Sequence, residues 1–165
     1  MSQLYAEAGV KRKDTMSTMA LRFLLIAGIV VGALLLFLGG IFGIVGVILI
    51  VGLVYLYPKL NVDYEYVFVD GQLDFDKITG KAKRKTILRL DMEQMEIIAP
   101  ENSHALDGYT HVQYEKKDFT SRSKEGKNYI IIASQAEKRY RIAFEPTEKM
   151  LTMMKQKSPR KIAQY

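Results

Sequence analysis

The chain contains no cysteine among its 165 residues. Disulfide bonds, thiolate catalysis and cysteine-based zinc sites are therefore excluded. The chain also lacks a Walker loop, a dinucleotide-binding glycine fingerprint, a nucleophile elbow and an HExxH motif. No recognisable residues are left to carry catalysis, so we expect a protein that is not an enzyme and that uses no cofactor.

Charged side chains are missing from residues 23–57, a run far longer than the roughly 18 apolar residues that indicate a transmembrane helix. As one helix the run would be roughly 52 Å long, whereas the hydrocarbon core of a bilayer is about 30 Å thick. Gly39 and Gly40 lie near its middle and allow the backbone to reverse. The run predicts a membrane helical hairpin of two transmembrane helices, residues 19–38 and 41–57.

A signal peptide or a single long span could also produce an apolar run near the N-terminus. A secretory signal peptide has an apolar stretch of only about 7 to 15 residues and ends at a small-residue cleavage site, and the chain meets neither condition. A single long span could absorb the excess length by tilting or kinking. The single span stays open as an alternative, and it would place the C-terminal domain outside the cell.

Charge and aromatic residues around the run predict its orientation. Basic residues precede or begin the first span: Lys11, Arg12, Lys13 and Arg22. Such residues mark the cytoplasmic side of a membrane. The second span ends with Tyr55 and Tyr57, which suit the headgroup level, followed by Pro58 and Lys59. We expect a multi-pass protein of the cell membrane, with the N-terminal segment 1–18 and the C-terminal domain in the cytoplasm.

After the spans, the pattern predicts a mainly β domain. Residues 64–69 and 72–76 are strand-like and are separated by Asp70-Gly71, a strong hairpin signal. A second turn is expected at Thr79-Gly80. Further strands are predicted at residues 85–90, 95–98, 128–133 and 139–144, and marginal ones at 109–114 and 118–122.

The period changes near the C-terminus. Pro146 and Thr147 open a segment in which Met150, Leu151 and Met154 recur at helical spacing. Ser158-Pro159 ends it. The segment predicts one amphipathic helix, followed by a basic tail over residues 158–165.

Several short strands followed by one amphipathic helix resemble a pleckstrin-homology-like (PH-like) domain of the bacterial membrane-tethered kind. The resemblance covers residues 61–157. It implies an antiparallel barrel that the hairpin of residues 64–76 opens and that the C-terminal α-helix caps. The layout of a two-span anchor followed by this domain is similar to that of small bacterial membrane proteins, which share no uniform activity. An antiparallel barrel of another type would use almost the same cues.

The densest basic cluster follows the second predicted turn; it consists of Lys81, Lys83, Arg84 and Lys85, with Arg89 nearby. A basic residue near an anionic leaflet gains about 1 kcal/mol, so the cluster predicts membrane-surface contact. The alternative is a solvated turn whose charges keep a sheet edge from pairing with other chains. Lipid sites of pleckstrin type use the loop between the first two strands, which here is the short Asp70-Gly71 turn without a basic residue.

Four glycines form two GxxxG pairs around the predicted turn: Gly28, Gly32, Gly39 and Gly43. Small residues at this spacing allow close approach of helix backbones in lipid. We interpret them as helix-packing residues within the hairpin, with a homodimer interface as the alternative.

His104, Asp107 and His111 are the residues that could suggest a metal site. Gly108 and Thr110 argue against a helix that would align them. We therefore interpret the three as loop residues and expect no metal.

The chain has 24 Lys and Arg against 18 Asp and Glu. Most are interleaved rather than gathered in a stripe, so we expect no nucleic-acid partner. The leading hypothesis is a non-catalytic, membrane-anchored interaction module that presents a PH-like domain at the inner leaflet, with the lipid bilayer and a protein, anionic lipid or second copy as partners. The alternatives are an accessory subunit that assembles through its glycine-rich spans, and a membrane enzyme with an unrecognised site in residues 101–126.

Overall fold

The computed structural model describes residues 4–80, 82–124 and 126–163. The chain divides into two compact units. The helical unit comprises the described residues of 13–62 and 79–83, and the sheet unit comprises the described residues of 1–12, 63–78 and 84–165.

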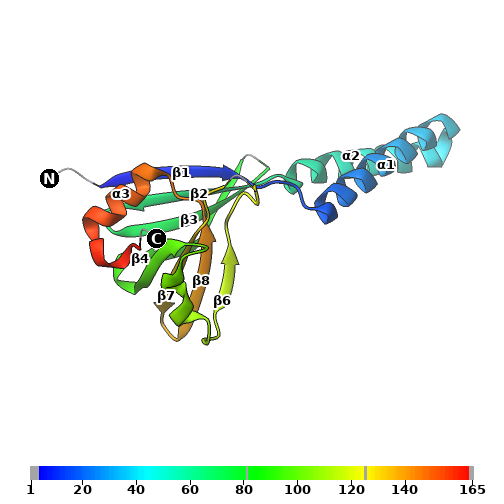
Figure 1. The fold of residues 1–165 in the computed structure, drawn as a ribbon. Helices are drawn as coiled ribbons and strands as arrows, with labels where there is room; N and C mark the ends of the chain where they lie inside the picture. Colours follow the sequence, from blue (N-terminus) through cyan, green and yellow to red (C-terminus); the bar gives the residue numbers. More distant parts are fainter. Residues whose placement is uncertain (1–3, 81, 125, 164–165) are drawn as a thin grey trace. The chain divides into compact units, whose positions relative to one another are not determined.

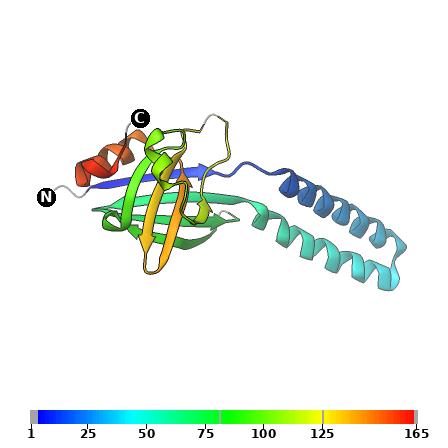
Figure 2. The same cartoon turned by 60° about the horizontal axis from the view of Figure 1, so that its bottom comes forward.

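The helical unit contains two long helices. They are α1 (Met16–Leu38) and α2 (Gly40–Leu56), followed by the short 3-10 helix η1 (Tyr57–Leu60). The chain reverses between them at Gly39 and Gly40, whose φ angles are 66° and 55°, and the two helices lie side by side (Figure 2). The apolar run therefore forms two helices rather than one, as its length predicts.

Both helices expose apolar side chains along most of their surface. Phe37 is 90% exposed and Phe23 is 78% exposed. The two helices contact each other through a narrow face that includes the buried residues Gly32 and Gly46. Both are long and apolar enough to cross a membrane.

The sheet unit holds two four-stranded sheets. Sheet A has the order β1-β2-β3-β4, with bounds Tyr5–Lys11, Val62–Val69, Gln72–Thr79 and Lys83–Asp91. Sheet B has the order β5-β7-β8-β6, with bounds Met95–Pro100, Tyr129–Gln135, Lys138–Phe144 and Glu115–Asp118. The remaining elements are α3 (Glu148–Lys157) and the 3-10 helices η2 (Met92–Gln94), η3 (His104–Tyr109) and η4 (Pro159–Lys161).

The N-terminal segment is part of the domain. Residues 5–11 form β1, which runs antiparallel to β2 in register from Tyr5 opposite Val69 to Lys11 opposite Asp63. Figure 1 shows β1 beside β2 at the edge of sheet A. The domain expected at residues 61–157 therefore begins before the apolar run, and the two helices are inserted between its first two strands.

The expected antiparallel barrel is wrong. A barrel closes when the edge strands of a sheet pair with one another, whereas the order of the two sheets leaves β4 and β6 as separate edges. Sheet B is also not purely antiparallel, because β6 runs parallel to β8, with Glu115 opposite Tyr140.

The core lies between the two sheets. The Phe144 ring of sheet B meets Tyr66 and Phe75 of sheet A edge to face, with ring centroids 5.7 and 5.9 Å apart. Helix α3 contributes Met150 and Met154, both fully buried, and lies beside β1 (Figure 1).

The hairpin and the C-terminal helix that local sequence patterns predict are both confirmed. The hairpin around Asp70-Gly71 is β2–β3, with φ of 47° at Asp70 and 106° at Gly71. Thr147 is the N-cap of the predicted C-terminal helix, and its side chain accepts a hydrogen bond from the Met150 amide. The marginal strands at 109–114 and 118–122 are wrong, because the strand in this region is β6 at residues 115–118.

The described part of the basic tail is packed on the domain. Ile162 forms a parallel bridge with Ile98 of β5. The Lys161 Nζ atom donates to the Met92 carbonyl oxygen at 2.7 Å. Residues 158–163 of the predicted basic tail are therefore part of the folded domain.

Candidate functional site

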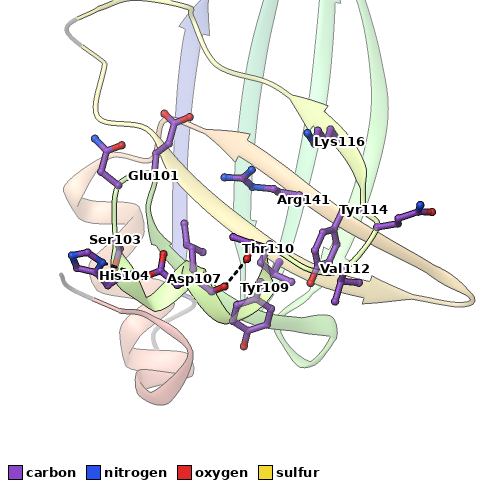
Figure 3. Close-up of a pocket in the computed structure, with 14 residues that line it drawn as sticks. Glu101, Ser103, His104, Asp107, Tyr109, Thr110, Val112, Tyr114, Lys116 and Arg141 are labelled. Atoms are coloured by element: carbon purple, nitrogen blue, oxygen red, sulfur yellow. Dashed lines mark hydrogen bonds and ion pairs between the residues drawn. The ribbon is translucent and has the colours of Figure 1, made fainter.

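A pocket of about 690 Å³ lies on the face of sheet B that points away from the core (Figure 3). The chain between β5 and β6 passes over this face and forms its walls, including Tyr109 and Tyr114. Ile132 of β7 and Arg141 of β8 also line it. Its volume falls within the roughly 300–1,000 Å³ typical of small-molecule sites.

The wall is held in place by a short 3-10 helix and its cap. The Ser103 Oγ atom accepts a hydrogen bond from the Ala105 amide at 3.3 Å, which caps η3. At the other end the Thr110 hydroxyl donates to the Asp107 carbonyl oxygen at 2.8 Å, drawn as a dashed line in Figure 3. Side-chain hydrogen bonds therefore fix both ends of η3, the part of the wall between residues 103 and 110.

A second small hydrophobic core anchors the wall to the sheet. Leu106 of η3 packs with Ala99, Ile130 and Ile132, all buried. Because β7 has the main core on one face and this cluster on the other, both of its faces are apolar. This explains why residues 130–133 are a continuous apolar run rather than an alternating one.

Two basic side chains line the pocket. Lys116 of β6 and Arg141 of β8 are opposite each other in the parallel register. Arg141 is half-buried and Lys116 is exposed. In the part of the chain that the structure describes, neither side chain makes a hydrogen bond or an ion pair.

The carboxylates nearest in sequence to Lys116 have other partners. Glu115 lies 2.6 Å from the Lys117 Nζ atom. Asp118 accepts a hydrogen bond from Arg122 Nε at 3.0 Å. Neither acid therefore forms an ion pair with Lys116 or Arg141.

An acidic side chain on the rim of the pocket, Glu101, also has a partner of its own. Its Oε2 atom accepts a hydrogen bond from Asn128 Nδ2 at 2.9 Å. Figure 3 shows Glu101 on one side of the pocket and Lys116 with Tyr114 on the other, with Arg141 between them. The lining of the pocket therefore has an acidic side and a basic side.

Tyr114 contributes a neutral phenol to the lining of the pocket. Burial raises the pKa of Tyr114 above its usual value near 10, and the carboxylate of Glu96 raises it further, although Arg139 acts in the opposite direction. At neutral pH the hydroxyl therefore stays protonated and can donate or accept a hydrogen bond.

The candidate metal ligands are not brought together. His104 and Asp107 lie on η3, with Nδ1 and Oδ2 3.2 Å apart and the His104 side chain fully exposed. They belong to a 3-10 helix, not to the expected loop, and His111 follows in the turn after it. Over residues 4–80, 82–124 and 126–163, no group of three His, Cys, Asp or Glu side chains could hold a metal ion.

The predicted basic cluster is partly neutralised. Arg84 Nε lies 2.6 Å from Asp76 Oδ2, and Arg84 also contacts Glu65 at 3.1 Å. The Asp76 hydrogen bond raises the pKa of Arg84. These contacts make Arg84 part of the sheet rather than a free surface charge.

Arg89 has a similar role further along β4. It forms a bidentate pair with Asp74, at 2.8 and 2.7 Å, which raises the pKa of Arg89. Lys83 and Lys85 are exposed on β4. Lys81 lies outside the described residues. The cluster thus presents lysine charge to solvent while its two arginines are paired.

The glycines predicted to pack helices fall into two groups. A Cβ at Gly28 would lie 2.6 Å from Leu53 Cδ1, and one at Gly32 would lie 2.8 Å from Ile50 Cγ1. Gly28 and Gly32 therefore face α2. A Cβ at Gly39 would meet nothing within 4 Å, and one at Gly43 would make an ordinary contact with Leu36 at 3.9 Å.

Sequence reasoning missed the Lys116–Arg141 pair. A signal for Arg141 was present, because the apolar residues Tyr140, Ile142 and Phe144 alternate along the predicted strand 139–144, which leaves Arg141 on the opposite face. No comparable signal exists for Lys116. Its position depends on the parallel pairing of β6 with β8, strands separated by a long loop and by β7.

Comparison with known proteins gives a family match over nearly the whole chain. Residues 2–164 match the family described as Bacterial PH-like domain (DUF6106). No curated protein matches, and no solved structure matches.

Proposed function

The chain belongs to the bacterial PH-like domain family (DUF6106), and we propose that it is a non-catalytic, membrane-anchored interaction module. In this proposal α1 and α2 cross the membrane as a hairpin. The PH-like domain then lies at the inner leaflet, where it contacts a protein partner or anionic lipid.

The observation that carries the proposal is the pairing of β1 with β2. Lys11, just before the apolar helices, is opposite Asp63, just after them. Strands that share one sheet must lie on the same side of a membrane, so the apolar run between them has to cross an even number of times. This supports two spans and argues against the single tilted span.

The dimensions of the helices fit this arrangement. α1 has 23 residues and α2 has 17, against the 17 to 25 or so that a spanning helix needs. Their exposed apolar side chains would be unfavourable in water by about 25 cal/mol for each Å² of apolar surface. A bilayer removes that cost.

The orientation rests on charge. The basic residues Lys11, Lys13 and Lys59 flank the two ends of the apolar run. Under the positive-inside rule these ends are cytoplasmic. Confinement at the inner leaflet would raise the effective concentration of any weak binding surface on the domain.

The accessory-subunit alternative receives less support. It requires glycine faces that are open to another protein. Gly28 and Gly32 are covered by Leu53 and Ile50 of α2, and of the predicted set only Gly39 and Gly43, at and after the turn, are open. The enzyme alternative requires an acid, base or nucleophile in the 101–126 region. The histidine that lines its pocket, His104, is paired with Asp107 at full exposure, which is a poor setting for a perturbed catalytic group.

Cysteine labelling in intact cells tests the proposal, because the native chain has no thiol. Single substitutions Lys13→Cys, Ile41→Cys and Lys124→Cys place one thiol before the helices, one at their turn and one in the domain; all three positions are exposed. With an impermeant maleimide, only Ile41→Cys should be labelled. Labelling of Lys124→Cys in intact cells would overturn the inner-leaflet placement, and lysed cells provide the control that each thiol can react.

A further inference from the structure

The Lys116–Arg141 pair is the strongest unexplained feature of the sheet unit. Two like charges on neighbouring strands disfavour each other, and here they lie opposite each other in the register of β6 and β8. In the described part of the chain no acidic side chain pairs with either. An anion held between the two groups would relieve this repulsion.

The backbone fixes the position of Arg141. Its neighbours Tyr140 and Ile142 are buried in the main core, so alternation along β8 directs Arg141 to the outer face, where the pocket lies. Its guanidinium is therefore carried by a central strand of sheet B rather than by a loop. A binding group on a strand is more precisely placed than one on a loop.

The walls of the pocket add aromatic side chains to the two cations. Tyr109 and Tyr114 line the pocket with aromatic rings, which Figure 3 draws below Arg141. The Thr110 hydroxyl is also in the lining but already donates to the Asp107 carbonyl oxygen. Aromatic side chains bind flat or apolar groups over a large area. The pocket thus has a doubly cationic part next to an aromatic part.

We propose that this pocket binds a phosphate monoester of a small organic molecule, with the phosphate on Arg141 and Lys116 and the organic part against Tyr109 and Tyr114. A phosphate monoester carries about −1.5 to −2 charges at neutral pH, which matches two cations. The arginine fork binds two phosphate oxygens at once, and the lysine adds a point charge. The proposal does not depend on how the chain is anchored.

Titration of the full-length protein in detergent with phenyl phosphate tests the proposal by calorimetry. Arg141→Gln should weaken binding by about tenfold or more, because it removes a bidentate charged contact. Lys116→Gln should weaken it by a smaller factor. Arg160→Gln is the matched control, because Arg160 is exposed on η4 and does not line the pocket, and it should leave binding unchanged.

Further ligands separate the charge requirement from simple aromatic binding. Phenol should not compete, and methyl phenyl phosphate, which has one charge fewer, should bind more weakly than phenyl phosphate. Rising salt should weaken binding. The proposal is overturned if phenyl phosphate does not bind the parent protein, if phenol binds equally well, or if Arg160→Gln and Arg141→Gln have equal effects.

A lipid headgroup and a soluble metabolite can both carry a phosphate monoester. The protein in nanodiscs that contain phosphatidic acid is therefore compared with the protein in nanodiscs of phosphatidylcholine alone. Loss of phenyl phosphate binding in the first case would identify a lipid as the source of the phosphate. Equal binding in both would identify a soluble molecule.

Discussion

Ala6 of β1 and Phe68 of β2 are opposite each other in sheet A, and neither exposes any surface. The strand that precedes the apolar helices is therefore part of the core that follows them. Ala8 is buried in the same way, and α3 packs on this strand.

The first prediction concerns a domain without its helices. In the register of β1 and β2, Lys11 is opposite Asp63, so Arg12 and Val62 are the next two residues toward the helices. Residues 13–61 can therefore be replaced by an Asn-Gly turn that joins β1 to β2. We expect this hairpin-free domain to be soluble and to unfold cooperatively in urea. A fragment that begins at residue 61 lacks β1 and should be less stable or should aggregate, since it exposes the β2 edge. Equal urea midpoints for the two would contradict the role of β1.

The second prediction concerns the Arg84–Asp76 pair. Asp76 is only 4% exposed, and its Oδ1 atom is buried without a partner among the described residues. Arg84→Gln should therefore destabilise the hairpin-free domain by about 1–3 kcal/mol, measured by urea unfolding. Lys85→Gln, at the next residue of the same strand, should change stability by less than about 0.5 kcal/mol. Equal effects would show that the Asp76 contact contributes little.

The third prediction concerns membrane-surface contact by the basic cluster. Arg84 and Arg89 are paired, so the exposed charge among the described residues of the cluster is on Lys83 and Lys85. Replacing both lysines with Gln should reduce binding of the hairpin-free domain to anionic vesicles at low salt, by about 1 kcal/mol for each charge.

Lys124→Gln/Lys149→Gln is the control for this experiment, because it removes the same charge from exposed positions elsewhere. Vesicle binding that does not depend on salt, or that the two double variants reduce equally, would reject a specific role for the cluster.

The fourth prediction concerns the contact between α1 and α2. A Cβ at Gly46 would lie 2.5 Å from the Gly32 carbonyl oxygen, whereas one at Gly52 would meet nothing within 4 Å. Gly46→Ala should therefore separate the helices and cost about 1–3 kcal/mol, seen as a lower melting temperature of the full chain in detergent. Gly52→Ala should be neutral or slightly stabilising. A reversed order would mean that the helices pack through another face.

The fifth prediction concerns stability at high pH. Burial raises the pKa of Tyr66 far above its usual value near 10, and its hydroxyl donates to the Phe119 carbonyl oxygen at 2.5 Å. The folded state therefore keeps this proton at a pH where the unfolded chain loses it. The stabilisation is fully present below about pH 10 and is lost as the pH rises above that value.

Tyr66→Phe removes the titrating group, so the free energy of unfolding of the variant should fall less steeply above about pH 10 than that of the parent domain. The variant should also be less stable at neutral pH, by about 1 kcal/mol, because the hydrogen bond to Phe119 is lost. Identical slopes for the two proteins would indicate that Tyr66 ionises without unfolding the domain.

What the sequence predicted correctly is local. The β2–β3 hairpin follows from Asp70-Gly71, and α3 follows from a helical period after Pro146. The two apolar helices follow from a charge-free run and a glycine pair. In each case the residues that decide the structure form one continuous segment of the chain.

What the sequence did not predict depends on distant pairing. β1 has small residues, Ala6 and Ala8, at its buried positions, so its apolar alternation is weak, and its partner strand lies beyond both helices. β6 consists of charged residues, and its parallel pairing with β8 has no local signal. The pocket depends on both β6 and the wall over sheet B, so it could not be derived before the topology was known.

The insertion of the helices between β1 and β2 also sets an order for biosynthesis. The ribosome makes β1 first, then both helices, and only then the strand that β1 pairs with. At about 5–20 residues per second, β1 waits several seconds without its partner while the apolar segment is delivered to the membrane. Sheet A can therefore be completed only after the second helix has left the ribosome. In the proposed arrangement, both helices are available for membrane insertion before the domain can fold.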